Sequence, residues 1–169
     1  MLLKQGTVFE NRVKDYLISP VLYLYNAGDE CTAVTGGYDF YAFWGNTTTS
    51  EVIITKESSY IQIVVNGGST GYFGGIASAN VIPTAHNTLN VDFEMSSTGS
   101  FPATDTRIGF IPSKTNEVTF DAMWKTAATS ISRQTISLDI SSIGDTDYLA
   151  IINGGNRVAT LKIYSVWLE

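Results

Sequence analysis

The sequence predicts an all-β protein, an antiparallel β-sandwich preceded by a short N-terminal leader. Three observations carry this prediction. Apolar residues alternate with polar ones over short segments, turn residues recur at spacings of ~8–12 residues, and only one segment has helical spacing. With 169 residues, 44% of them hydrophobic, the chain is long enough for one domain with its own core.

The N-terminal segment is the single candidate helix. In residues 7–19, four apolar side chains share one face at helical spacing, and Pro20 would end the helix. We therefore expect a leader, residues 1–19, and a sandwich, residues 20–169. The leader would either cap the sandwich or end an oligomerisation stalk.

The rest of the chain predicts about ten strands separated by turns rich in glycine, asparagine and serine. They are expected at residues 21–26, 38–44, 51–55, 60–65, 72–76, 89–95, 107–111, 118–125, 135–140, 148–153 and 158–167. In the last strand, Leu161, Ile163 and Trp167 occupy alternate positions, so we expect Trp167 in the core and this strand to close the sandwich. Trp124 shares a strand face with Phe120 and is also expected in the core.

Charge and composition exclude several classes of function. The net charge is −6 without a basic stripe, which argues against nucleic-acid binding. Cys31 is the only cysteine and is expected to be a small buried residue, whereas His86, the only histidine, is expected in a solvent-facing loop. We find no zinc-site pattern, nucleophile motif, signal peptide or membrane-spanning run.

Two segments resemble known proteins. Residues 22–40, LYLYNAGDECTAVTGGYDF, are similar to segments in phage tail and minor structural proteins. The closing pattern SLDISSI, YLAI and ATLKIYSVWLE resembles the last strands of jelly rolls of the carbohydrate-binding-module type. The resemblance implies a jelly-roll sandwich displayed on a phage particle, used for adhesion or assembly, and it brings no catalytic motif.

Aromatic residues are the strongest binding signal. A flat ring offers a platform for the apolar face of a sugar and loses few rotamers on binding. Trp44 ends an aromatic strand just before Gly45, so we expect it at a rim of the sandwich. Tyr72 and Phe73 lie in a glycine-flanked segment where rings can be exposed.

Asp92 and Glu94 form a carboxylate pair on one strand face, with Cα atoms ~6.5–7 Å apart. Together with Asn90 they are explained most simply as the solvated face of a strand whose other face is core. They are also candidates for contacts to a ligand, and their spacing leaves a glycosidase pair open.

A calcium ion is a further candidate ligand. Asp29 and Glu30 follow the first strand in a glycine-bearing loop, and jelly-roll binding modules often hold calcium near their chain ends. Calcium takes six to eight oxygen ligands, many of them carbonyls that a sequence does not reveal.

These observations predict a non-enzymatic virion or extracellular surface module that binds a bacterial surface polysaccharide. The expected partners are copies of the same chain, as a trimer by analogy with fibres, and other virion proteins, without nucleic acid or membrane insertion. One alternative is a structural or decoration protein that binds no sugar. Another is a glycan hydrolase that uses Asp92 and Glu94.

Overall fold

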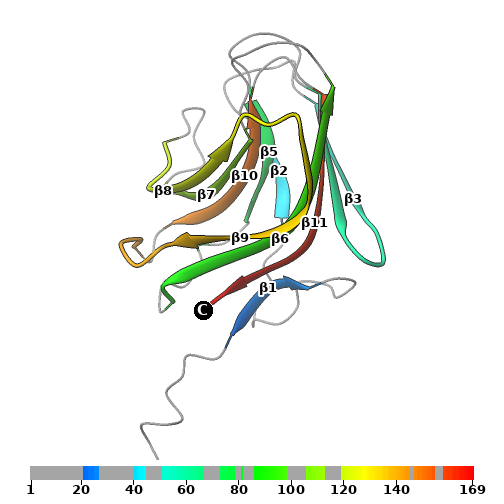
Figure 1. Ribbon diagram of the computed structural model, residues 1–169. Helices are drawn as coiled ribbons and strands as arrows, with labels where there is room; N and C mark the ends of the chain where they lie inside the picture. The colour runs from blue at the N-terminus through cyan, green and yellow to red at the C-terminus, as the bar shows by residue number, and fades with distance from the viewer. Residues whose placement is uncertain are drawn as a thin grey trace, which may run out of the picture.

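The computed structural model describes residues 21–26, 40–44, 51–66, 73–78, 81, 86–98, 106–112, 119–144, 147–154 and 158–169. Every regular element in this part of the chain is a β-strand, and the strands form two antiparallel sheets (Figure 1). The predicted all-β sandwich is therefore confirmed. The leader at residues 1–19 and Cys31 lie outside the described residues.

The six-stranded sheet has the order β3 (Glu51–Lys56), β4 (Ile61–Asn66), β11 (Val158–Leu168), β6 (Thr88–Thr98), β9 (Ser130–Asp139), and β1 (Leu22–Asn26) also pairs with β11. β4 and β1 pair with successive halves of β11, at residues 158–163 and 165–168. The final strand therefore lies in the middle of the six-stranded sheet, between β4 and β6.

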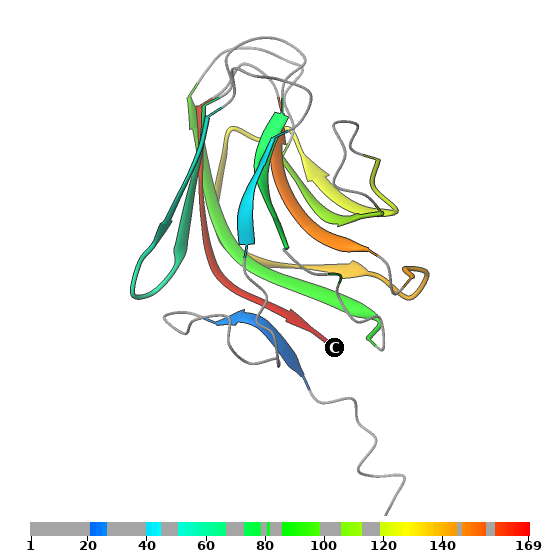
Figure 2. The same cartoon turned by 180° about the vertical axis from the view of Figure 1, so that it is seen from behind.

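The five-stranded sheet has the order β2 (Phe40–Trp44), β5 (Phe73–Ser78), β10 (Tyr148–Gly154), β7 (Thr106–Ile111), β8 (Ala122–Thr126). Both sheets bend in the same sense, as the views from the two sides show (Figures 1 and 2). The five-stranded sheet lies on the inside of the bend, so its outer face is concave and that of the six-stranded sheet is convex.

The core fills the space between the sheets. Phe93 of β6, Phe110 of β7 and Leu161 of β11 are at most 1% exposed. The Trp124 ring packs edge-on against Phe93, with centroids 5.5 Å apart, which confirms the expected position of Trp124 at the core. This contact joins β6 of one sheet to β8 of the other.

Two strand starts differ from the prediction by four residues or more, and β6 extends to Thr98, three residues beyond its predicted end. β9 begins at Ser130 and not at residue 135, because this edge strand starts with polar residues that show no apolar alternation. β8 begins at Ala122, and residues 119–121 before it are not in a strand. Strand pairing with β6 and β7, and not local sequence, sets both of these starts.

The prediction that Trp167 lies in the core is wrong. The pairing of β11 with β6 shifts between Ile163 and Ser165, which adds one residue to β11. A bulge of this kind reverses the alternation beyond it. Val166 and Leu168 are therefore buried completely, whereas Trp167 is only half-buried and contacts Tyr23 on the outer side.

The prediction that His86 faces solvent is also wrong, since it is only 7% exposed. The backbone that follows it is tied to two other segments. Asn87 N–H donates to the Glu169 carbonyl at 2.7 Å, and Ile140 N–H donates to the Asn87 carbonyl at 2.9 Å. These bonds hold the segment before β6 against the end of the sheet.

Candidate functional site

Six side chains gather on the convex outer face of the six-stranded sheet. We call them the polar–aromatic cluster: Tyr60, Asp92, Glu94, Arg133, Lys162 and Tyr164. They come from the residue before β4 and from β6, β9 and β11, so four separate parts of the chain meet here. Pairing of β11 with β6 places Lys162 opposite Glu94.

Two ion pairs organise the cluster. Lys162 Nζ donates to Glu94 Oε1 at 2.7 Å, and both side chains are 32% exposed. The Arg133 guanidinium binds the Asp92 carboxylate with two nitrogens, Nη2 at 2.7 Å and Nε at 3.2 Å. A two-nitrogen contact fixes both groups more firmly than a single hydrogen bond does. The strand face that was expected to be solvated therefore carries charges in defined positions.

Two tyrosine rings lie between these charges. The guanidinium carbon of Arg133 is 3.8 Å from the centre of the Tyr164 ring. Tyr60 packs edge-on against Tyr164, with centroids 5.7 Å apart, and Lys162 Nζ is 5.2 Å from the centre of the Tyr60 ring. Cation–π contacts of this geometry hold the rings in place.

The ion pair between Lys162 and Glu94 shifts the pKa of each group in the direction that favours its charged form. The hydrogen bond from Lys162 lowers the pKa of Glu94, and the same bond raises the pKa of Lys162. Burial raises the pKa of Tyr164, and the negative charge of the nearby Glu94 raises it further. Glu94 is thus held ionised. A glycosidase general acid needs a raised pKa, so Glu94 is poorly suited to that role.

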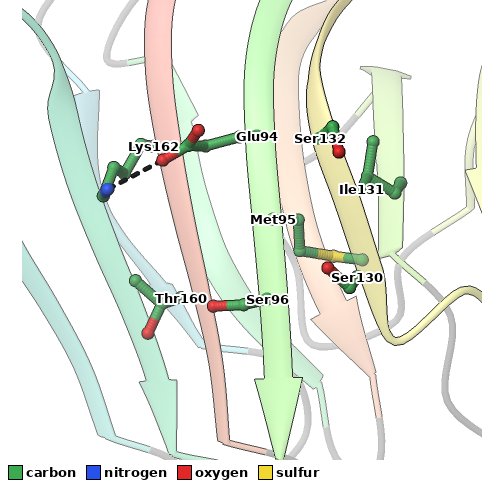
Figure 3. A pocket seen from close by; sticks show the side chains of 8 residues that line it. All are labelled: Glu94, Met95, Ser96, Ser130, Ile131, Ser132, Thr160 and Lys162. Atoms are coloured by element: carbon green, nitrogen blue, oxygen red, sulfur yellow. Dashed lines mark hydrogen bonds and ion pairs between the residues drawn. The ribbon is translucent and has the colours of Figure 1, made fainter.

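A shallow pocket of about 220 Å³ opens beside the Lys162–Glu94 pair (Figure 3). Its wall carries the hydroxyl groups of Ser96, Ser130, Ser132 and Thr160 together with the apolar side chains of Met95 and Ile131. The volume is below the ~300–1,000 Å³ of pockets for drug-sized ligands. The lining therefore suits a small group that has both hydrogen-bonding atoms and an apolar face.

Asn90 departs from the prediction for this face. It was expected to be solvated with Asp92 and Glu94 but is only 5% exposed. Its Oδ1 accepts a 2.6 Å hydrogen bond from the Ser137 hydroxyl on β9. Asn90 lies between β11 and β9 and opposite Trp167, and these neighbours cover it.

The concave outer face of the five-stranded sheet has a different character. In β10, Leu149 and Ile151 face the other sheet, so Ala150 and Ile152 face outward. These two and their neighbours Ala77 and Ile111 are nevertheless at most 1% exposed. This part of the face therefore presents no surface that a ligand can reach.

The remaining predicted site residues are placed only in part. Trp44 pairs with Gly74 and Phe73 with Gly154, so both lie near one end of the five-stranded sheet by their backbone register. Tyr72, Asp29 and Glu30 lie outside the described residues. The structure brings Asp92 and Glu94 into one cluster but does not test the three aromatic candidates or the proposed calcium ligands.

Sequence reasoning missed four of the six cluster residues. The partners of Asp92 and Glu94 are 41 and 68 residues away along the chain. Lys162 and Tyr164 could have been found, because they alternate with buried residues in β11 and so face outward. Arg133 lies in the part of β9 that was not predicted as a strand.

Comparison with solved structures shows the fold. The family 11 carbohydrate-binding module from Clostridium thermocellum, in complex with a β-1,3-1,4-mixed-linked tetrasaccharide, superposes with a TM-score of 0.50 at 16% identity, over 88% of this chain and 94% of that one. The fold is a jelly roll.

Two other solved structures resemble the chain at a lower level. A family 29 carbohydrate-binding module has a TM-score of 0.49 at 14% identity and covers 89% of this chain and 92% of its own. The bacteriophage CBA120 tailspike protein 4 has a TM-score of 0.47 at 13% identity over 85% of this chain and 21% of that one. No protein-family model and no curated protein matches the chain.

Among the described residues, no three histidine, cysteine or acidic side chains come together in a group that would hold a metal ion. The same part of the chain has no helix of the length and apolarity needed to cross a bilayer.

Proposed function

We propose that this protein is a non-catalytic carbohydrate-binding module and that its ligand binds at the polar–aromatic cluster. The observation that carries the proposal is the arrangement of two tyrosine rings among two fixed ion pairs beside a pocket lined by hydroxyl groups and two apolar side chains. The jelly-roll fold, in which the family 11 module holds its tetrasaccharide, supports the same function.

The chemistry of the cluster matches the chemistry of a sugar. A sugar ring has an apolar face that packs on an aromatic ring and hydroxyl groups that donate and accept hydrogen bonds. Tyr60 lies at the border of the cluster and is half-buried, so its ring offers such a surface. Glu94 and Lys162 are each 32% exposed and can accept from and donate to hydroxyl groups, respectively.

The proposal also includes where the module is displayed and how it assembles. The resemblance of residues 22–40 to phage tail proteins supports a place on the surface of a phage particle, as a trimer that contacts bacterial polysaccharide and other virion proteins. Repetition of a weak site would raise the overall affinity through effective concentration. Light scattering tests the assembly: a mass below that of a trimer of the 18.4 kDa chain contradicts it.

A glycan array of bacterial surface polysaccharides and plant glucans tests the binding site. We expect wild-type protein to bind at least one glycan and Tyr60→Ala to weaken that binding about tenfold, as truncation of an aromatic anchor does. Lys125→Ala, an exposed substitution on β8 of the other sheet, is the matched control and should bind like wild type.

Two other outcomes would redirect the proposal. If Tyr148→Ala on β10 abolished binding and Tyr60→Ala did not, the ligand would bind at the concave face. If folded wild-type protein bound no glycan, the structural or decoration role would replace carbohydrate binding.

A further inference from the structure

A second aromatic pair lies on the same face of the six-stranded sheet as the polar–aromatic cluster. The rings of Tyr23 on β1 and Trp167 on β11 are 6.1 Å apart and tilted by 35°. Tyr23 is 41% exposed and Trp167 is half-buried. The two rings adjoin on the outer side of the sheet, and both are partly open to solvent. Together they form a broad apolar platform.

The local structure holds this platform in place. Tyr23 and Trp167 are directly paired residues of β1 and β11. The bulge in β11 turns Trp167 outward, and its indole Nε1 donates to Glu169 Oε1 at 2.9 Å. The indole ring is therefore held at two places, by a neighbouring ring and by a carboxylate, and needs little reorganisation to receive a ligand.

The platform and the cluster are connected along β11. Lys162 and Trp167 are five residues apart on one strand, a distance of roughly 16 Å at ~3.3 Å per residue. Between them, the Ser165 hydroxyl donates to Asn26 Oδ1 at 3.1 Å, and Ser165 lies opposite Asp92. Polar groups thus fill the interval between two aromatic positions.

The charges of the polar–aromatic cluster are balanced, and the platform adds the carboxylate of Glu169. Lys162 is paired with Glu94, and Arg133 is paired with Asp92. The chain as a whole carries a net charge of −6, which repels a polyanion. A ligand that extends along β11 is therefore expected to be uncharged.

We propose that Tyr23 and Trp167 form a second subsite and that, with the polar–aromatic cluster, they bind a linear neutral polysaccharide along β11. This inference rests on the proposed function and adds to it the length and the charge class of the ligand. The chain of the polysaccharide lies parallel to β11, with one sugar on the Tyr23–Trp167 platform and another beside Tyr60.

Native affinity electrophoresis tests the charge class. The gels contain mixed-linked β-glucan, dextran, mannan or polygalacturonate. We expect at least one neutral polymer to retard the protein and polygalacturonate to leave its mobility unchanged. Retardation by polygalacturonate alone would overturn the assignment to neutral ligands.

Calorimetry with short and long oligosaccharides of the retarding polymer tests the second subsite. We expect Trp167→Ala to weaken binding of a hexasaccharide about tenfold and to leave binding of a disaccharide unchanged. Tyr23→Ser, at an exposed position, is a second variant that removes a ring without disturbing the core. Val21→Ala, 47% exposed and next to β1, is the matched control and should bind like wild type.

The outcomes separate this inference from the proposed function. If Trp167→Ala and Tyr23→Ser both bind the hexasaccharide like wild type, the second subsite is wrong and the cluster stands alone. If either variant changes the mass of the assembly instead of the affinity, the platform is a contact between subunits. If wild-type protein is retarded by no polymer, both proposals fall together.

Discussion

The outer faces of the two sheets differ in what their strands bury. On β6 of the six-stranded sheet, Val91 and Phe93 are completely buried and alternate with the partly exposed Asp92 and Glu94. On β10 of the five-stranded sheet, all residues from 149 to 152 are at most 1% exposed. β6 of the six-stranded sheet therefore has one solvated face, whereas β10 of the five-stranded sheet is buried on both faces.

This difference is visible in the strand sequences. A strand with one solvated face alternates, as VDFEM does in β6, whereas a strand buried on both faces is a continuous apolar run, as YLAII is in β10. The alternating sheet provides places for polar and charged side chains. The continuous runs provide stability, and under the proposed function the two sheets divide recognition and stability between them.

The substitutions with the largest expected effect on stability lie in the five-stranded sheet. A Cβ at Gly109 would overlap the carbonyl oxygen of Ala122, and one at Gly75 would overlap that of Ile151, so backbone must move in either case. We expect Gly109→Ala and Gly75→Ala each to lower the free energy of unfolding by about 3 kcal/mol, as overpacking does. Urea denaturation measures it.

Ser96→Ala on the solvated face of β6 is the comparison for these glycine substitutions. Its side chain is exposed, and a surface change of this kind alters stability by about 0.5 kcal/mol or less. Equal losses for Ser96→Ala and Gly109→Ala would mean that the two sheets do not differ in tolerance.

A smaller loss of stability is expected when buried Asn90, on the solvated face of β6, loses its hydrogen-bond donor. Ser137→Ala removes the hydrogen bond to Asn90 Oδ1 and leaves that buried oxygen without its donor. We expect a loss of about 1–2 kcal/mol, since an unpaired buried polar atom bears its desolvation cost. Thermal unfolding monitored by circular dichroism measures it. The neighbouring Thr135→Ala, at an exposed position, should lose much less.

The strands themselves could be predicted because their alternation is local. The fold class and nearly all strand positions follow from segments of about five residues, each of which contains its own period. Ser130 to Gln134 escaped prediction since a segment of an edge strand in which only Ile131 is apolar has no period to detect. The outward turn of Trp167 escaped prediction because a bulge is a property of pairing with β6 and not of β11 alone.

Of the polar–aromatic cluster, the two carboxylates could be predicted from the sequence, but their charged partners could not. Asp92 and Glu94 stand out since they are carboxylates on the polar side of an alternating strand. That Arg133 and Lys162 neutralise them depends on which strands lie beside β6, and the order β11–β6–β9 brings together residues far apart in sequence. The sequence contained the charges but not their pairing.

The smallest expected effect is the dependence of stability on pH at the Lys162–Glu94 pair. The pKa of Glu94 is lowered from 4.5 in the folded chain, so its contribution to stability is present above that value and is lost as the pH falls through the lowered pKa. The pKa of Lys162 is raised from 10.5, so its contribution is lost only as the pH rises through the raised value. Between roughly pH 5 and pH 10 the pair should therefore contribute a constant amount.

Glu94→Gln isolates this contribution because it keeps the shape of the side chain and removes its charge. We expect a small decrease in the urea midpoint relative to wild type at pH 7, since exposed ion pairs stabilise weakly. The difference should shrink as the pH falls through the lowered pKa of Glu94, because the wild-type carboxyl group also becomes protonated there. A difference that stayed the same from pH 7 to pH 3 would show that Glu94 acts through packing, and the polar–aromatic cluster would then owe its order to the tyrosine rings instead of its charges.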